Sequence, residues 1–173
     1  MELSNQPLDP SVRYFQRLGW PQGTNAGRGG RVRYDARQTL QMCCGFELLQ
    51  LGLSPERVVR FMVRMEVMFA QAFHKAALGE IIFVMFDPAI LSSLAWGGDI
   101  EKNDQFCWLI DSDRLTQRFK QYDSLAQKRR LAWINVSVLL ARVLAALGED
   151  APKEAELICE LSAWASEPAL QIA

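Results

Sequence analysis

The sequence has 173 residues, of which 50% are hydrophobic and 23% are charged, and its formal net charge is −1. These values are ordinary for a soluble globular protein of one domain or two small ones. The longest apolar stretch, residues 131–147, is too short for a membrane span and is interrupted by Asn135 and Arg142. The first ten residues lack a secretory signal pattern, so we expect a cytoplasmic protein.

Charge is distributed unevenly along the chain. Residues 1–64 contain nine arginines, no lysine and five acidic residues, a net charge of +4, which leaves −5 for the remainder. A basic N-terminal segment followed by an acidic remainder suggests that the N-terminal segment binds a polyanion. The use of arginine alone indicates the same partner, because the planar guanidinium group pairs with phosphate through two hydrogen bonds.

The first predicted element is a short helix in the segment SVRYFQRLGW, residues 11–20. Its apolar residues recur at helical spacing along one side. Three polar residues, Arg13, Tyr14 and Arg17, fall on the opposite side, where they are available to a partner.

A loop rich in arginine and glycine follows, GRGGRVRY at residues 27–34, and it contains no acid. A Walker phosphate-binding loop is excluded as its explanation, because the stretch has no Lys, Ser or Thr and follows no buried strand. A β-hairpin wing explains it better, since glycines at the tip let the backbone approach a duplex closely. Arg28, Arg31 and Arg33 would then contact phosphates or reach into the minor groove, while the preceding helix lies in the major groove.

The rest of the chain predicts mainly helices with one short β element. A helix over 36–51 is capped by Asp35, and a second begins at Pro55 and ends near Gly79. In chain order there follow a strand over 81–86, a strand over 105–111, a long helical region from about 113 to 148, and a last helix opened by Pro152.

One face of the long helical region has the spacing of a helix-to-helix seam. The residues, spaced three and four apart, are Trp133, Val136, Leu140, Val143 and Leu147. Such a seam can pair between subunits or pack inside one. We predict that it forms the interface of a homodimer.

The N-terminal third of the sequence resembles a known protein family. The segment VRYFQRLGW, the Gly/Arg-rich turn, and VRYDARQTLQMCCGFELLQLGLSPERVVRFM together resemble the MerR-type winged helix-turn-helix, over about residues 11–65. Members of that family carry an IRYYERxGLL-like recognition helix, a wing ending in R-x-Y, a helix, a Gly-[LF]-[ST] turn and a further helix. The family's full helix before the recognition helix has almost no room here, because only ten residues precede it and they include Pro7 and Pro10.

The resemblance implies a role for each matching residue. Arg13, Tyr14 and Arg17 would be contacts of the recognition helix. Arg31, Arg33 and Tyr34 would be contacts of the wing with the DNA backbone. A two-fold dimer would place two recognition helices on a pseudo-palindromic site in double-stranded DNA.

The sequence therefore predicts a mainly α (α+β) protein in two parts. Residues 1–78 would form a MerR-like winged helix-turn-helix module, and residues 79–173 a helical domain with a two-stranded element for dimerisation and for sensing an unknown effector. The expected function is that of a sequence-specific DNA-binding transcriptional regulator acting as a homodimer. The alternative is a non-enzymatic protein-interaction or assembly module with a degenerate winged fold.

Catalysis is not expected, and neither is a metal site or a cofactor. The sequence contains neither Gly-x-Ser-x-Gly nor His-Glu-x-x-His, and its only histidine, His74, lies near a predicted helix end. The four cysteines, Cys43, Cys44, Cys107 and Cys159, fit no zinc-binding spacing.

Overall fold

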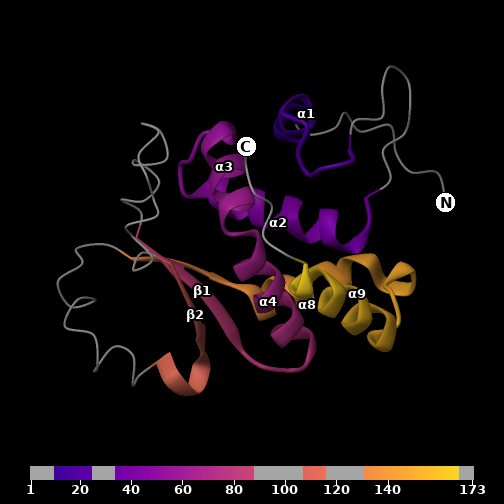
Figure 1. Ribbon diagram of the computed structural model, residues 1–173. Helices are drawn as coiled ribbons and strands as arrows, with labels where there is room; N and C mark the ends of the chain where they lie inside the picture. Colours follow the sequence, from indigo (N-terminus) through magenta and orange to yellow (C-terminus); the bar gives the residue numbers. More distant parts are fainter. Residues whose placement is uncertain (1–9, 25–33, 88–106, 116–130, 168–173) are drawn as a thin grey trace. The chain divides into compact units, whose positions relative to one another are not determined.

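The computed structural model describes residues 10–24, 34–87, 107–115 and 131–167. This part of the chain is mainly helical with a small three-stranded antiparallel sheet. The elements, in order, are α1 (Pro10–Arg17), α2 (Ala36–Gln50), α3 (Pro55–Arg64), α4 (Glu66–Ala77), β1 (Ile82–Phe86), β2 (Cys107–Asp111), β3 (Ala132–Asn135), α8 (Val136–Leu147), the 3₁₀ helix η2 (Gly148–Asp150) and α9 (Glu154–Ser166) (Figure 1).

The chain divides into two compact units, Met1–Val59 and Arg60–Ala173, and the division falls within α3. The sequence placed the domain boundary later, after residue 78. Within the described part, no helix is long and apolar enough to cross a membrane.

The first unit is built around α2. Asp35 accepts a hydrogen bond from the Gln38 backbone N–H at 2.7 Å, and the Gln38 side chain accepts one from the Asp35 N–H at 3.1 Å. These two bonds form a capping box, which satisfies N–H groups that the first turn of a helix otherwise leaves unpaired. The predicted Asp35 cap and the helix that follows it are therefore confirmed.

Aromatic packing holds α1 in the first unit. Phe15 is fully buried, and its ring lies 5.0 Å from the Trp20 ring and 6.1 Å from the Phe46 ring, measured between centroids. Gly45 of α2 permits this approach, because a Cβ at that position would lie only 3.0 Å from a ring carbon of Trp20. The helix side that the sequence predicted to be apolar is thus fixed mainly by Phe15.

Two predicted helices differ in their extent. The helix expected from Pro55 to about Gly79 is wrong as a single element, because it is divided at Met65 into α3 and α4. The last helix begins at Glu154 rather than at Pro152.

The predicted two-stranded element is a three-stranded sheet in the order β2-β1-β3. In the antiparallel β1–β2 pair, Phe86 lies opposite Cys107, and in the antiparallel β1–β3 pair it lies opposite Ala132. Both predicted strands are present, as Ile82–Phe86 and Cys107–Asp111. The third strand falls where the sequence predicted helix, so that expectation was wrong for residues 132–135.

The two faces of the sheet bury different side chains. On one face, the Phe86 ring lies 5.0 Å from the Phe61 ring between centroids, and Cys107 Sγ lies 3.2 Å from Met68 Sδ in α4. On the other face, Met85 and Ile110 are buried together. The sheet therefore buries apolar side chains on both faces, and this packing stabilises strands that would be marginal on their own.

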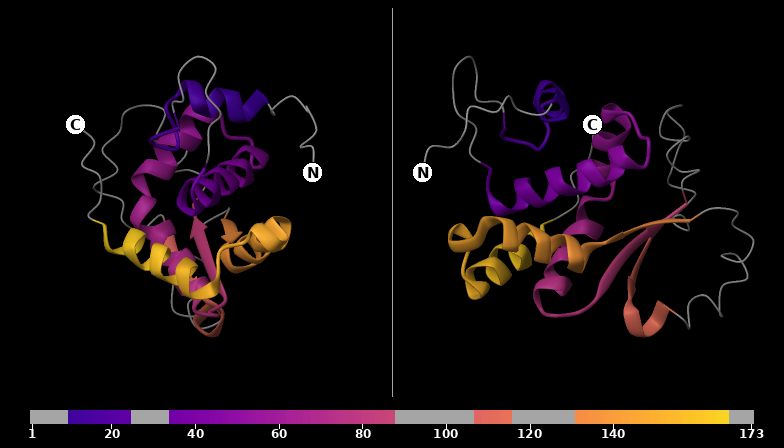
Figure 2. Two further views of the ribbon diagram at one scale, coloured as in Figure 1. Left: turned by 90° about the vertical axis from the view of Figure 1, so that its right-hand side faces the viewer. Right: turned by 180° about the vertical axis from the view of Figure 1, so that it is seen from behind.

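Three helices pack together beside the sheet in the second unit. Figure 2 shows α8 and α9 lying next to α4, and both helices contact it. The Leu157, Leu161 and Trp164 side chains of α9 are buried, and the Trp164 ring stacks on Phe73 of α4 with the centroids 6.1 Å apart. The side of the last helix predicted to be apolar is confirmed.

A serine hydroxyl joins α8 to the start of the sheet. Ser137 Oγ donates to the Glu80 carbonyl at 2.8 Å and accepts from the Ile82 N–H at 2.9 Å. We expect Ser137→Ala to lower the free energy of unfolding by about 1–3 kcal/mol, because it leaves a partly buried backbone donor without its acceptor.

The matched control for this change is Ser166→Ala. The Ser166 hydroxyl is exposed and donates to the Ser162 carbonyl at 2.8 Å within α9. Its loss is expected to change the free energy of unfolding by only about 0.5 kcal/mol. Equal effects of the two substitutions in urea denaturation would show that the Ser137 bridge contributes no specific stability.

Candidate nucleic-acid interface

The outer side of α1 carries the three polar residues that the sequence singled out. Arg13, Tyr14 and Arg17 are all exposed, while Phe15 between them is buried. Arg13 and Arg17 are four residues apart and therefore lie on the same face, one turn above the other. The helix thus presents two guanidinium groups to the solvent, with the partly exposed Tyr14 ring beside them.

The segment that carries Arg28, Arg31 and Arg33 lies outside the described residues, but the structure describes the residues that precede and follow it. Before it, the Gln22 carbonyl accepts a hydrogen bond from Gln38 Nε2 at 2.7 Å. After it, the Tyr34 hydroxyl accepts one from Gln16 Nε2 of α1 at 2.8 Å. The first bond joins Gln22 to α2, and the second joins Tyr34 to α1.

Tyr34 therefore has a structural partner in addition to the DNA contact predicted for it. Its hydroxyl is half-buried and accepts from Gln16. A phenol that accepts one hydrogen bond can still donate its proton, for example to a phosphate oxygen.

A carboxylate is also present at this face. The Tyr14 hydroxyl donates a short hydrogen bond to Glu56 Oε1 in the first turn of α3. This bond, together with the negative charge of Glu56, raises the pKa of Tyr14 above its ordinary value. The phenol therefore stays protonated at neutral pH, and its proton is directed at a group of the protein itself.

The residues predicted for the dimer seam do not share one helix. Trp133 lies in β3 with 55% of its surface exposed, and the other four lie in α8. Val136 and Leu140 are buried within the second unit, Val143 is half-buried, and Leu147 is 40% exposed. Trp133 and Leu147 are thus the members of the set with the most surface available to a second subunit.

Within the described ranges, no three side chains among His, Cys, Asp and Glu come together in a way that would hold a metal ion. Two of the cysteines are deeply buried. Burial raises the pKa of the Cys107 thiol to about 12 and that of Cys44 well above its ordinary value. Both thiols are therefore protonated at neutral pH and are poor nucleophiles.

Sequence reasoning missed two residues of this surface. Neither Gln16 nor Glu56 was predicted to belong to it. Glu56 contacts a tyrosine 42 positions away, and Gln16 contacts one 18 positions away. No local pattern reports contacts over such separations, so a sequence signal for them was lacking.

The comparisons with known proteins give no relative of this chain. No family model matches the sequence, and searches of curated proteins and of solved structures give no match.

Proposed function

We propose that this protein is a sequence-specific DNA-binding transcriptional regulator that acts as a homodimer. Its N-terminal part would be a winged helix-turn-helix module of the MerR type, as the resemblance over about residues 11–65 implies. In this proposal α1 lies in the major groove, and the loop that carries Arg28, Arg31 and Arg33 follows the backbone beside it.

The observation that carries the proposal is the hydrogen bond between Gln16 and Tyr34. It ties the end of the arginine loop to α1, and the outer side of that helix holds Arg13 and Arg17. Tyr34, the last residue of the loop, is therefore held against the helix that carries the other two arginines. A helix with an adjoining cationic loop is the arrangement that a winged module uses to contact both a groove and the phosphates.

The chemistry of α1 fits the major groove. A guanidinium group can donate two hydrogen bonds to guanine O6 and N7, the most common specific contact between a side chain and a base. Two arginines one turn apart on an exposed face would read neighbouring base pairs. Phe15 on the opposite side anchors the helix through aromatic packing.

The test is a selection from random-sequence duplex DNA with the purified protein at two salt concentrations. A regulator retains a defined set of sequences, which should be pseudo-palindromic if the protein is a dimer. Its affinity falls steeply between the two salt concentrations, because each phosphate contact releases counterions. Recovery of unenriched DNA only, at either salt concentration, would contradict the proposal.

One observation favours the alternative, a protein-interaction or assembly module that keeps the winged fold without contacting DNA. The Glu56 carboxylate of α3 accepts a hydrogen bond from the Tyr14 hydroxyl, so a negative charge lies next to α1. A negative charge there repels phosphates and suits a protein partner better. The selection separates the two candidates, since an interaction module enriches no sequence.

If the protein binds DNA, Glu56→Gln should strengthen binding to selected and unselected duplexes alike. The change removes a charge that repels phosphates, and two charges about 4 Å apart in water interact by about 1 kcal/mol, which corresponds to a roughly fivefold lower Kd. The ratio of specific to nonspecific affinity should change little, and fluorescence anisotropy measures both values.

Glu160→Gln is the control for this substitution. Glu160 is exposed in α9, so the same change in net charge occurs outside the first unit. It should leave both Kd values nearly unchanged. An equal gain in affinity from the two variants would mean that only net charge matters and that Glu56 does not lie at the DNA.

A further inference from the structure

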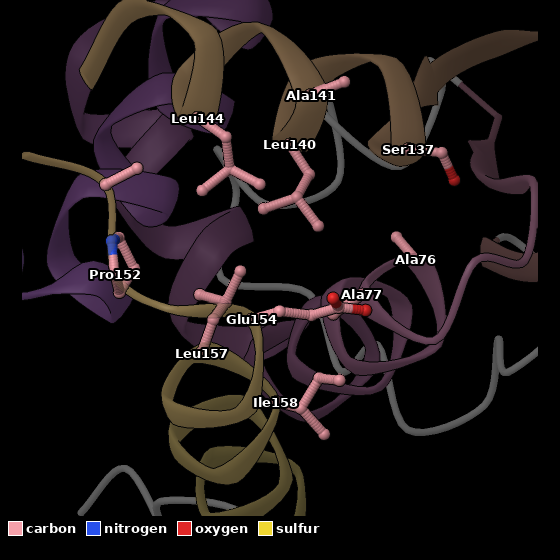
Figure 3. A pocket seen from close by; sticks show the side chains of 11 residues that line it. Ala76, Ala77, Ser137, Leu140, Ala141, Leu144, Pro152, Glu154, Leu157 and Ile158 are labelled. Carbon is pink, nitrogen blue, oxygen red and sulfur yellow. The ribbon is translucent and has the colours of Figure 1, made fainter. Parts of the chain in front are cut away.

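The second unit contains a pocket between three helices. Its wall is formed by the last turn of α4, by α8, and by the start of α9 with the residues just before it. Figure 3 shows Leu140 and Leu144 of α8 pointing across the space toward Leu157 of α9, with Ala76 of α4 at one side.

The size of the pocket suits a small organic molecule. Its volume is about 380 Å³, which lies at the lower end of the range of roughly 300–1,000 Å³ found for ligand sites. The described residues that line it all belong to the second unit.

Among the described residues the lining is almost entirely aliphatic, and two of its members are polar. One of them, Ser137, already uses its hydroxyl to bridge Glu80 and Ile82. The other, Glu154, is exposed in the first turn of α9, and in Figure 3 its carboxylate reaches toward Ala77. A carboxylate only accepts hydrogen bonds, and the positive end of the helix dipole favours its charge at this position.

We propose that this pocket binds a small apolar molecule that carries a hydrogen-bond donor, with Glu154 as the acceptor. The apolar body would be buried among Leu140, Leu144, Leu157 and Ile158, which supply affinity through the area that they remove from water. The donor, an amine or a hydroxyl group, would fix the orientation of the molecule at the rim. Such a site stands independently of DNA binding by the first unit.

The first test uses the fluorescent probe N-phenyl-1-naphthylamine, an apolar molecule with one N–H group. Titration of the full chain should give saturable fluorescence enhancement. Ala76→Phe should weaken binding at least roughly tenfold, because the added ring occupies the space into which Ala76 points. Ala145→Phe is the matched control, since Ala145 is an exposed alanine of α8 outside the pocket.

The second test examines the polar contact by competition. 1-Aminonaphthalene should displace the probe at lower concentration than 1-methylnaphthalene, which has a similar shape and no donor. Glu154→Met should remove this preference, whereas Glu156→Met should keep it. Both acids lie in the first turn of α9, so both variants lose the same dipole interaction, and Glu156 does not line the pocket.

The two tests have distinct outcomes. Saturable binding that is lost in Ala76→Phe and kept in Ala145→Phe supports the pocket as the site. Absence of saturable binding, or equal binding by these two variants, overturns the proposal. An amine preference that survives in Glu154→Met overturns the assignment of Glu154 as the acceptor. Circular dichroism spectra of all four variants confirm that each one is folded.

Discussion

Replacing Arg13 and Arg17 together by alanine is expected to weaken binding to the selected DNA by about 2–6 kcal/mol. The estimate takes about 1–3 kcal/mol for each bidentate contact to a base. The Kd should therefore rise at least roughly 30-fold. Folding should be little affected, because both side chains are exposed and the anchor of the helix is Phe15.

The two single variants show more clearly than the double variant how each arginine contributes to recognition of the DNA sequence. If each arginine contacts a base, Arg13→Ala and Arg17→Ala should each relax the preference at one position of the half-site. If an arginine contacts a phosphate instead, its loss should weaken binding to all sequences and reduce the slope of log K against log salt by about 0.9. Selection with each variant at two salt concentrations distinguishes these roles.

Arg114→Ala with Arg142→Ala provides the matched double variant. Both side chains are exposed in the second unit, and Arg114 makes an ion pair with Asp111 at 3.4 Å. The change in net charge is the same as for Arg13 and Arg17. Comparable losses of affinity in the two double variants would mean that binding reflects overall charge, and α1 would no longer be the recognition element.

The helices were predictable where their signals are local. Asp35 and Gln38 stand three residues apart, which is the spacing of a capping box, and the structure has both hydrogen bonds. Gly52 has φ = 85°, in the left-handed region that favours glycine after a helix, and α3 begins three residues later at Pro55. Each of these signals acts within one turn of the chain, so a single sequence is sufficient to detect it.

The third strand could not be predicted because two patterns coincide in the same residues. The apolar spacing of a helix seam continues through Trp133 and Val136, and a four-residue strand is too short to display an alternation of its own. Asn135 separates the strand from the helix. Its Oδ1 accepts a hydrogen bond from the Val138 N–H at 3.0 Å, which makes Asn135 the N-cap of α8. Its position inside an apolar run was a signal for an N-cap, but the sequence alone does not show that β1 is available to pair with the residues before it.

The candidate interface was predictable in part, namely where it depends on the local spacing of residues in one helix. Helical periodicity places Arg13, Tyr14 and Arg17 on the side opposite Phe15, and the structure has all three exposed. The contacts that join this helix to the rest of the unit, from Gln16 to Tyr34 and from Tyr14 to Glu56, depend on the tertiary fold. The exposed polar residues of α1 could therefore be predicted from local spacing. The residues that hold this helix in place could not, because their contacts depend on the tertiary fold.

Phe15→Ala is expected to destabilise the first unit by about 3–5 kcal/mol, the usual cost of removing a fully buried aromatic side chain. Phe15 fixes α1 through its contacts with Trp20 and Phe46, and its ring and that of Trp20 both pack closely against Gly45 of α2. A folded domain is commonly stable by only about 5–15 kcal/mol, so this loss is a large fraction of the total.

Hydrogen–deuterium exchange followed by mass spectrometry can assign this loss to the correct part of the chain. Peptides from residues 10–24 and 34–59 should exchange much faster in Phe15→Ala, while peptides from 131–167 should be little changed, because they belong to the second unit. Leu18→Ala is the control, since Leu18 is 39% exposed and its truncation should cost far less. Unchanged exchange in residues 34–59 of Phe15→Ala would show that α1 does not stabilise the unit, and a helix so loosely held could not position Arg13 and Arg17 in a groove.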